Sequence, residues 1–399
     1  MSEDALGVSP TTLQERIDSG DPVRALDLRN RDEVDRWRLA GPGVTVTQRS
    51  NATFIQARVT DAIAEFVADI DGEGPIVVVC ARGEASREAA AELAARGYDA
   101  RNLEGGMEAW ARLLLSADLP VEGDDFAVVQ YRRPASGCLG YAVVSGGEAA
   151  VVDPLRAFTE RYAADARERD ATVEYVVDTH VHADHVSGLR ELAAATGATA
   201  VMPAEAVERG VTYDVATVAD GAKLQVGEAT LEAVHAPGHT TGMSAFAVGG
   251  GDAGSSADTP DAGVLLAGDS LFVGSVARPD LERGSGGARD LARELHRTLT
   301  ERFARFSDRT LVAPGHHAEG VRPDETGAVT ARLGALRALR AFDMDPDAFI
   351  DHVTDDMPPR PANFERVIAV NLGREHADAE AAFELELGPN NCAATLADD

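Results

Sequence analysis

Histidine and carboxylate side chains gather in the segment DTHVHADHVSG, which covers residues 178–188. The chain has ten histidines, and this segment holds three of them beside the carboxylate of Asp184: His180, His182 and His185. Imidazole nitrogens combined with carboxylate oxygens are typical ligands of zinc and non-haem iron, whereas magnesium and calcium prefer oxygen ligands. We therefore expect this segment to contribute to a metal centre.

Three further side chains occur in a similar local context. His239, Asp269 and His316 each end a short apolar run followed by a small-residue turn, in VHAPGH, VLLAGD and LVAPGH. Such apolar runs predict buried strands, and neighbouring strands bring the loops at their ends to one edge of a sheet. We therefore expect these residues to meet the segment 178–188 at a single site.

A cysteine indicates a second chemistry. Cys80 ends the apolar run PIVVVC and opens the segment CARGEAS, which leads into a predicted helix. A thiol at that position faces the N–H groups of a tight loop and the positive end of a helix, which stabilise a thiolate or an anionic persulfide. Arg82 and Arg87 are candidates for steering an anion towards this sulfur. The alternative is a buried cysteine without a chemical role.

The pattern of apolar residues predicts two α/β domains. Residues 1–118 alternate short apolar strands with helical segments, which is typical of a parallel sheet covered on both faces. The polar segment SADLPVEGDD, residues 116–125, is interpreted as a linker. From residue 125 to residue 399 the sequence is rich in strands separated by helices, which predicts sheets sandwiched between helices.

The second domain is predicted to have a core and a tail. The core spans about 125–320, and a helical tail follows from 324 to 399 and ends in a frayed CAATLADD. Within the core, the segment 249–263 is small, polar and rich in glycine, so it is predicted to be a flexible surface loop. The three cysteines are far apart and odd in number, which argues against a disulfide framework.

The charge of the chain limits its partners. A net charge of -30 arises from 67 acidic and 37 basic residues, and Lys223 is the single lysine. Acidic residues are dispersed along the chain, which favours a solvated surface suited to a salty cytoplasm and an origin in a halophilic archaeon. The alternative is a surface that mimics a polyanion. Nucleic acid is an unlikely partner for this charge, and no signal peptide or membrane-spanning run is present, so a cytoplasmic protein is expected.

The motif H-x-H-x-D-H followed by His239, Asp269 and His316 resembles the metallo-β-lactamase superfamily over roughly residues 125–320. The resemblance implies an αββα sandwich with metal bound at one edge of its sheets. In binuclear members of that superfamily, the positions matching His180, His182 and His239 hold one metal ion. The second ion is held by the positions matching Asp184, His185 and His316, and Asp269 bridges the two.

Two branches of the superfamily fit this pattern. One contains thioesterases like hydroxyacylglutathione hydrolase, in which two Zn(II) ions activate a hydroxide. The other contains the persulfide dioxygenases, and the resemblance then assigns a single Fe(II) to His180, His239 and Asp269. Two histidines and one carboxylate leave positions open for a substrate sulfur and for O2. The remaining histidines and Asp184 then orient the ligands without binding the metal.

The segment GDSLFVGSVARPDL, which contains Asp269, distinguishes these branches. It resembles the dioxygenases, which carry an R-x-D motif at the distance of Arg278 and Asp280. In that branch the arginine lies near the thiol substrate, where a fixed cation can pair with a carboxylate. The alternative is that Arg278 and Asp280 form a structural ion pair. The tail segment PPRPANFERVIAVNLG also resembles dioxygenase-like proteins of bacteria and archaea rather than the thioesterases.

The loop C-x-x-G-x-x-S, with LDLRNRDEVDRW before it and NLEGGMEAW after it, resembles the rhodanese sulfurtransferases over about residues 8–115. The resemblance implies a parallel-sheet domain in which Cys80 carries sulfur as a persulfide. Two departures stand out: RLAGPGVTV replaces the usual GHIPGA-like segment, and Ala85 stands where arginine is common. Related phosphatases need an arginine where this chain has Ser86, which argues against phosphatase activity.

Together the two resemblances predict an enzyme of sulfur metabolism. One Fe(II) per chain is expected to oxidise a low-molecular-weight thiol persulfide with O2 to sulfite. Cys80 is expected either to make the persulfide from thiosulfate or to consume sulfite as thiosulfate. The alternatives are a dizinc thioesterase and a persulfide carrier whose metal domain only binds. No nucleic acid or membrane is expected as a partner, and a homodimer stays open.

Overall fold

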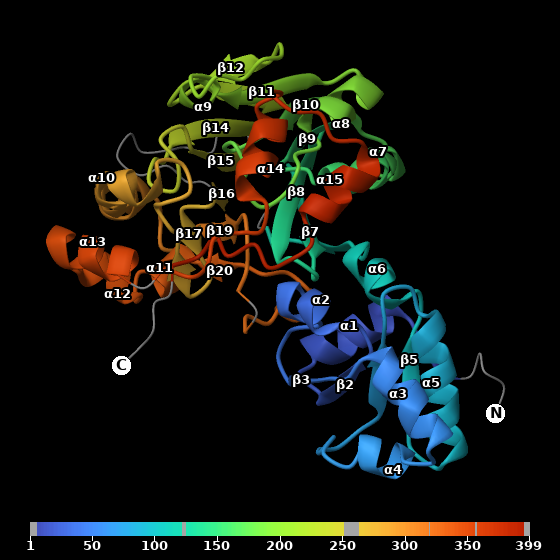
Figure 1. The fold of residues 1–399 in the computed structure, drawn as a ribbon. Helices are drawn as coiled ribbons and strands as arrows, with labels where there is room; N and C mark the ends of the chain where they lie inside the picture. Colours follow the sequence, from blue (N-terminus) through green and yellow to red (C-terminus); the bar gives the residue numbers. More distant parts are fainter. Residues whose placement is uncertain (1–5, 122–124, 251–262, 319, 356, 395–399) are drawn as a thin grey trace.

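The computed structural model describes residues 6–121, 125–250, 263–318, 320–355 and 357–394 (Figure 1). The predicted surface loop at 249–263 therefore falls mostly outside the described residues, as do the last five positions of the chain. Within the described residues, no helix is long and apolar enough to cross a membrane.

The first domain is built on a five-stranded parallel sheet with the order β1-β5-β4-β2-β3. Its strands are β1 (Gly7–Val8), β2 (Val23–Asp27), β3 (Val44–Gln48), β4 (Ile76–Val79) and β5 (Ala100–Leu103). Its helices are α1 (Pro10–Asp18), α2 (Arg31–Arg36), α3 (Asn51–Val59), α4 (Ile63–Phe66), α5 (Glu84–Ala95) and α6 (Gly106–Ala111). Strand β4 is buried along its whole length, as its continuous apolar run predicts for a strand covered on both faces.

The second domain contains two sheets. The seven-stranded sheet has the order β12-β11-β10-β9-β8-β7-β6, and its strands are β6 (Leu115–Asp118), β7 (Ala127–Arg133), β8 (Cys138–Ser145), β9 (Glu148–Val152), β10 (Thr172–Val177), β11 (Thr199–Pro203) and β12 (Ala216–Val218). The six-stranded sheet has the order β13-β14-β15-β16-β19-β20, and its strands are β13 (Lys223–Val226), β14 (Ala229–His235), β15 (Ser244–Gly250), β16 (Val264–Gly268), β19 (Leu311–Pro314) and β20 (Ala331–Arg332). A small hairpin of β17 (Leu271–Phe272) and β18 (Ser275–Val276) follows β16.

Apolar side chains bind these sheets and their helices into four layers. Tyr141, Phe246 and Leu266 are among the buried residues that pack between the two sheets. Helices α7 (Thr159–Glu168) and α8 (Leu189–Thr196) cover the outer face of the seven-stranded sheet. Helices α10 (Gly284–Arg297) and α13 (Pro346–Asp355) pack together over the six-stranded sheet. The predicted αββα sandwich is confirmed, as is the preceding parallel-sheet domain.

The boundary between the domains lies earlier than the sequence indicated. Residues 115–118, which were assigned to the first domain and its linker, form β6 and pair antiparallel with β7 of the second domain. The reason is that β6 is an edge strand with only half-buried or exposed side chains, so its sequence has the polar character of a linker.

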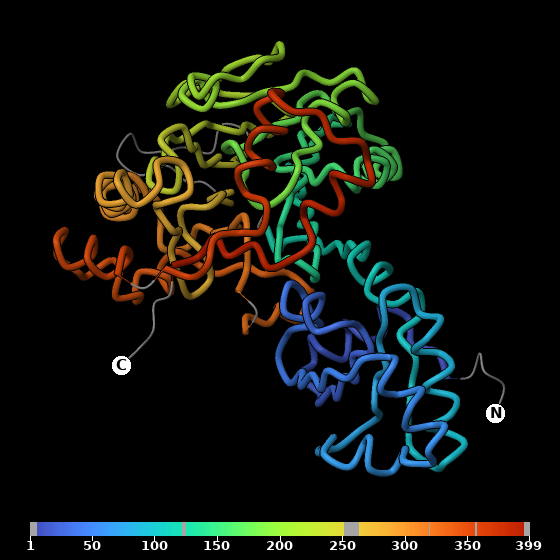
Figure 2. The backbone as a smooth tube through the Cα atoms, in the orientation of Figure 1, coloured from blue at the N-terminus to red at the C-terminus, as the bar shows by residue number. Residues whose placement is uncertain are grey.

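The tail returns across the sandwich to the ends of its strands. Helices α14 (Phe364–Asn371) and α15 (Ala379–Leu385) pack on Val186, which lies within the histidine-rich segment 178–188. Figure 2 shows the course of this tail, in red, across the second domain. Cys392 and Ala394 are buried, and the backbone N–H of Ala394 donates to the carbonyl of Val276 at 2.8 Å. The expected fraying of CAATLADD is therefore wrong for its first three residues, because they add to the hairpin of β17 and β18.

Candidate metal centre and cysteine loop

The residues predicted to bind metal meet at one edge of the sandwich. His180, His182 and His185 follow β10 of one sheet, while His239, Asp269 and His316 follow β14, β16 and β19 of the other. All six side chains and that of Asp184 are buried. The strands of the two sheets end side by side, so residues far apart in sequence converge as the repeated strand-and-turn context predicted.

Three of these residues form a donor set with free ligand atoms. The Nε2 atoms of His180 and His239 lie 3.9 Å and 3.6 Å from Oδ2 of Asp269. These three atoms are buried and have no hydrogen-bond partner among the described residues. Ligand atoms of the three side chains lie within 4.8 Å of one another. Buried polar atoms are normally paired, so three unpaired atoms that converge fit a divalent cation.

The hydrogen bonds behind these ligands fix their tautomers. The hydroxyl of Thr179 donates to Asp153 at 2.9 Å, so Nδ1 of His180 donates to the Thr179 oxygen at 2.8 Å. Nδ1 of His239 donates to the carbonyl of Arg278 at 2.9 Å. Each imidazole therefore carries its proton on Nδ1 and presents the lone pair of Nε2 to the centre, as a metal ligand must.

The charges of the set also suit a cation. Burial lowers the pKa of both His180 and His239, which keeps the two rings neutral. Burial alone would raise the pKa of Asp269, but the neighbouring His316 lowers it below its ordinary value, so the carboxylate is ionised. Neutral imidazole and ionised carboxylate are the protonation states that bind metal.

The second predicted set also offers two buried, unpaired atoms, Asp184 Oδ1 and His185 Nε2, but its third member, His316, is engaged in hydrogen bonds at both nitrogens. His316 lies between two carboxylates, with Nδ1 2.6 Å from Asp269 Oδ1 and Nε2 2.7 Å from Asp184 Oδ2. Burial alone would lower the pKa of His316, but Asp184 and Asp269 together raise it well above its ordinary value. A ring that donates from both nitrogens has no lone pair for a metal, so this set opens only when His316 loses a proton.

Cys138 joins this second set, although no sequence pattern predicted it. Its Sγ lies 3.1 Å from Asp184 Oδ2, and its ligand atom groups with those of Asp184, His185 and His316 within 4.8 Å. It stands at the start of β8, where an isolated cysteine in an apolar strand has no local signal.

The ring of His182 lies beside that of His180, with ring centroids 4.2 Å apart, but its Nε2 has other partners. Its Nε2 lies 3.1 Å from Asp153 Oδ1, and it groups with Asp153 and Asp178 rather than with His180 and His239. Burial raises the pKa of Asp178 to about 6. The Nδ1 atom of His182 is buried and unpaired, as are the Nε2 atoms of His180 and His239.

Two residues of the tail that the sequence did not single out hold the histidine-rich segment in place. The side-chain amide of Asn371 donates to the carbonyls of His182 and His185 at 3.0 and 2.9 Å, and its oxygen accepts from the N–H of Ser187 at 2.9 Å. Glu386 accepts from the N–H of Val186 at 2.9 Å. No local pattern could identify them, because their partners lie almost 200 positions earlier in the chain.

Arg278 adopts the structural arrangement that the sequence left as an alternative. Its side chain is only 1% exposed, and Nε and Nη2 bind the two oxygens of Asp280 at 2.7 and 3.2 Å. Nη1 donates to the carbonyls of Pro359 and Asn391 at 2.9 and 3.0 Å. The guanidinium thus holds two backbone carbonyls of the tail, and the backbone carbonyl of Arg278 itself orients His239.

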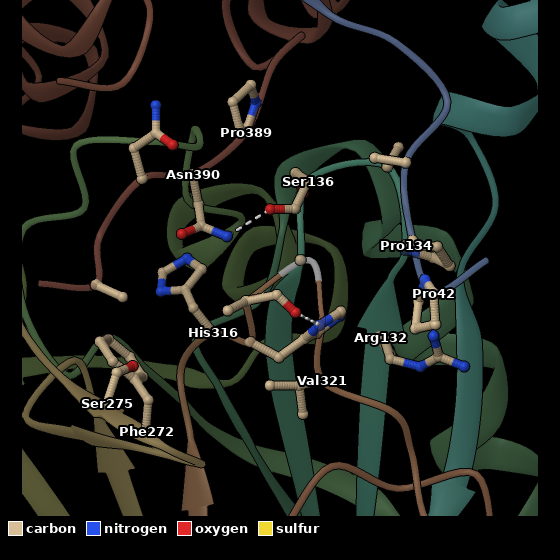
Figure 3. A pocket seen from close by; sticks show the side chains of 18 of the residues that line it. Pro42, Arg132, Pro134, Ser136, Phe272, Ser275, His316, Val321, Pro389 and Asn390 are labelled. Carbon is tan, nitrogen blue, oxygen red and sulfur yellow. Dashed lines mark hydrogen bonds between the residues drawn. The ribbon is translucent and has the colours of Figure 1, made fainter. Parts of the chain in front are cut away.

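A cavity of about 400 Å³ lies beside the metal centre and between the two domains. Figure 3 shows His316, Phe272 and Ser275 on one side of it and Pro42, Arg132 and Pro134 on the other. The cavity is the natural approach for a small molecule to His316, which is hydrogen-bonded to the candidate ligand Asp269.

The loop of Cys80 surrounds its sulfur with donors. Sγ accepts from the N–H of Gly83 at 3.1 Å and of Ser86 at 3.4 Å, and it lies 3.1 Å from the Ser86 hydroxyl. Helix α5 begins directly after Gly83, whose φ of 92° and close approach to the Gly105 nitrogen exclude a side chain. This arrangement is suited to a thiolate or a persulfide anion.

The two arginines near Cys80 differ in position. Arg82 and Cys80 line the same pocket of about 480 Å³. Arg82 also lines a neighbouring pocket of about 440 Å³, which contains Arg87 and does not contain Cys80. Arg82 is thus the better placed of the two to meet an anion at the sulfur.

The cysteine pocket and the metal-centre cavity open at opposite edges of the first sheet. Cys80 follows the carboxyl end of β4, whereas Asp18 and Gly41, which line the cavity, precede the amino ends of the parallel strands β2 and β3. Among the residues that the structure describes, none lines both the pocket and the cavity.

Comparison with known proteins agrees with this architecture. Residues 133–316 match the metallo-beta-lactamase superfamily, and residues 9–113 match the rhodanese-like domain. A hydroxyacylglutathione hydrolase of Rhodospirillum rubrum is 35% identical over 202 residues, which are 50% of this chain and 68% of that protein. The chain therefore belongs to the metallo-beta-lactamase superfamily, with a rhodanese-like domain before the metal-binding domain.

The other branch is also represented among the relatives. The mitochondrial persulfide dioxygenase ETHE1 of Bos taurus is 27% identical over 177 residues, which are 44% of this chain and 61% of that protein. The solved structure of ETHE1 from Myxococcus xanthus shares the fold, with a TM-score of 0.51 and 24% identity over 62% of this chain and 98% of that one. A metallo-beta-lactamase structure from Staphylococcus aureus gives a TM-score of 0.53 at 25% identity, covering 63% and 74%. The chain spans 37%, 68% and 44% of three of the curated relatives that it matches.

Proposed function

We propose that this protein oxidises a low-molecular-weight thiol persulfide to sulfite at a single Fe(II) held by His180, His239 and Asp269. The observation that carries the proposal is that these residues offer three converging, unpaired ligand atoms, while both ring nitrogens of His316 in the second set are engaged in hydrogen bonds. Two histidines and one carboxylate are typical of non-haem Fe(II) sites. Bound Fe(II) supplies the redox chemistry that allows O2 to react with sulfur.

The reaction is balanced as RSSH + O2 + H2O → RSH + H2SO3, in which the terminal sulfur is oxidised and O2 is reduced. The chain's own groups position the ligands for it: Thr179 orients His180, and the carbonyl of Arg278 orients His239. His316 holds Oδ1 of Asp269 and leaves Oδ2 free. Because His316 lines the cavity and carries a proton between two carboxylates, it can supply a proton to a departing thiolate.

Cys80 is proposed to transfer sulfane sulfur. Its thiolate attacks thiosulfate, forming Cys80–S–S⁻ and releasing sulfite, and a small thiolate then takes the outer sulfur to become a persulfide. Run in reverse, the same steps convert sulfite into thiosulfate. The N–H groups of Gly83 and Ser86 stabilise the anion in either direction. Since the two sites open at opposite edges of the first sheet, sulfur passes between them as a diffusing small molecule.

A dizinc thioesterase is the second candidate, and the 35% identity to a hydroxyacylglutathione hydrolase favours it. It requires His316 to release its proton so that Asp184, His185 and His316 can bind a second ion. A persulfide carrier whose metal domain only binds is the third candidate, supported by the donor-rich loop around Cys80.

The deciding experiment measures O2 uptake and sulfite release with glutathione persulfide, after reconstitution with Fe(II) or with Zn(II). The buffer should be rich in salt, because a net charge of -30 repels itself and salt screens that repulsion, as a halophilic origin would also require. We expect one iron per chain and equal amounts of O2 consumed and sulfite formed. Two zinc ions per chain, thioester hydrolysis and no O2 uptake would instead establish the thioesterase.

A further inference from the structure

Helix α15 of the tail lies between the rhodanese-like domain and the histidine-rich segment. On one side, Phe383 belongs to the same buried apolar cluster as Trp110 of the first domain, and the guanidinium carbon of Arg112 lies 3.9 Å from the centroid of the Phe383 ring. On the other side, Leu385 packs in a buried cluster with Val186 of the histidine-rich segment. One short helix therefore contacts both the first domain and the segment with the candidate metal ligands.

A buried ion pair accompanies these apolar contacts. Nη1 of Arg133 in β7 lies 2.6 Å from Oε2 of Glu386, and each side chain is only 1% exposed. Nε of Arg133 donates to the carbonyl of Ala111, the last residue of helix α6, at 3.0 Å. The other oxygen of Glu386, Oε1, accepts from the N–H of Val186 at 2.9 Å. One guanidinium and one carboxylate thus join a helix of the first domain to the histidine-rich segment.

The other end of helix α6 is bound to the Cys80 loop. The N–H of Met107 donates to the carbonyl of Cys80 at 2.9 Å. Gly106 has a φ of 64°, and a Cβ at this position would lie 2.4 Å from the Cys80 carbonyl oxygen, so only glycine fits. Helix α6 is therefore held at its start by the Cys80 loop, and its last residue accepts from Arg133.

The first domain is attached to both faces of β7. Arg132 and Arg133 are neighbours in this strand, so their side chains point to opposite faces. Arg132 pairs with Asp18 of helix α1, with Nη2 2.5 Å from Oδ2. Just beyond the strand, the carbonyl of Ala135 accepts from the indole N–H of Trp37 at 3.0 Å. These contacts fix the position of the first domain relative to the strand that carries Arg133.

We propose that Arg133 is a positioning residue for the metal centre and makes the placement of the histidine-rich segment depend on the rhodanese-like domain. Ala111 of the first domain fixes the guanidinium, and the guanidinium fixes the Glu386 carboxylate. Glu386 in turn holds the backbone directly after His185. This role goes beyond the proposed function and is the same for iron and for zinc, because it concerns the support of the ligands rather than the reaction.

Stability alone accounts poorly for this ion pair. Replacing a buried ion pair by apolar residues of similar size is often neutral or stabilising, because the cost of desolvating two charges offsets their attraction. Apolar side chains cannot replace the acceptor for the N–H of Val186 or the donor to the carbonyl of Ala111. The pair is therefore suited to placing two backbone segments relative to each other.

The test is a titration of the metal-free full chain with Co(II), followed through the absorption spectrum of the bound ion. The double variant Arg133→Met with Glu386→Met replaces the ion pair by two apolar side chains and leaves no buried charge without a partner. We expect its affinity for Co(II) to fall about three- to tenfold, the effect of one lost hydrogen bond, and its spectrum to change. Its unfolding in denaturant should stay close to that of the unchanged protein. The matched control makes the same exchanges at Arg366 and Glu375, an exposed ion pair of the tail, and should keep the unchanged spectrum.

A second variant tests the part played by the first domain. Arg133→Lys keeps a cation beside Glu386 but loses the Nε that donates to Ala111. We expect its Co(II) spectrum to change in the same direction as that of the double variant, by a smaller amount. If the double variant does not fold, Arg133→Lys alone decides.

Two results would overturn the proposal. A folded double variant with unchanged affinity and spectrum would exclude the positioning role. An Arg133→Lys protein with the spectrum of the unchanged protein would exclude the dependence on the rhodanese-like domain. Both measurements are made without O2 or a persulfide, so failure of the proposed oxidation would alter neither of them.

Discussion

The cysteine loop and the metal centre are built in opposite ways. Every donor around Cys80 comes from the next six residues, so a loop and the start of a helix are sufficient to form that site. The metal centre takes its ligands from the ends of strands in two sheets, and the tail supports it through Asn371 and Glu386. A local site tolerates change elsewhere in the chain, whereas a site assembled from distant segments depends on all of them.

The largest expected effect separates the two sites completely. Asp269→Ala removes the carboxylate of the free donor set, so O2 uptake and sulfite release should fall at least 100-fold while sulfur transfer from thiosulfate to cyanide persists. Cys80→Ala should abolish sulfur transfer from thiosulfate to cyanide and leave O2 uptake and sulfite release unchanged. Paired oxygen-electrode and thiocyanate assays measure both activities on the same preparations. Loss of both activities in the Cys80 variant alone would favour the carrier instead.

A second prediction concerns the ion pair of Arg278 with Asp280, next to the Arg278 carbonyl that orients His239. Asp280→Asn leaves the buried guanidinium of Arg278 without its carboxylate, so we expect a loss of about 3–5 kcal/mol in the free energy of unfolding at neutral pH. The Cys80 loop should retain its sulfur transfer in the folded variant, because no Cys80 contact involves this ion pair. Denaturant unfolding curves provide the measurement.

The effect of Asp280→Asn should depend on pH in a defined direction. Burial alone would raise the pKa of Asp280, but hydrogen bonds from Arg278 and Arg360 lower it below the ordinary value of 3.8. A carboxylate whose pKa is lower in the folded state than in the unfolded state stabilises the fold at pH values above its ordinary pKa. That stabilisation is lost as the pH falls through the pKa of the folded state. The difference in the free energy of unfolding between the unchanged protein and Asp280→Asn should therefore stay constant from pH 7 to about pH 5. It should become smaller below pH 3.8. A difference that grows on acidification would contradict the ion pair.

Sequence patterns predicted the parts of the molecule that repeat a local rule. Buried strands such as β4, and the placement of His239, Asp269 and His316 at strand ends, follow from apolar runs and turns. The supports were not predictable, because Asn371 and Cys138 carry no local signal and act only through tertiary contacts. The burial of Arg278 was not predictable for the same reason, since the carbonyls of Pro359 and Asn391 that accept from it belong to the tail.

A third prediction tests the tail as a support of the metal-binding segment. Asn371→Ala removes two donated hydrogen bonds and one accepted one, so the affinity for Co(II) or Zn(II) should fall about 10- to 100-fold, as is typical when a group that orients metal ligands is lost. The absorption spectrum of the Co(II) protein should also change, because the ligands are less well oriented. Arg366→Ala, on the exposed side of the same helix, is the control and should bind metal normally. An unchanged spectrum in Asn371→Ala would show that the loop holds its shape without the tail.

The smallest effect is expected at the cysteine loop. The ion pair of Arg82 with Glu108 is exposed, so we expect its loss to have little effect on the stability of the protein. Because Arg82 lines the pocket of Cys80, Arg82→Ala should raise KM for thiosulfate about threefold at low salt, an effect that shrinks as salt screens the charge. Arg87→Ala should have less effect, because Arg87 lines the neighbouring pocket, and Arg58→Ala on α3 controls for the loss of any surface cation. Equal effects of all three substitutions would mean that the net charge of the chain, rather than a placed arginine, governs how thiosulfate reaches the sulfur.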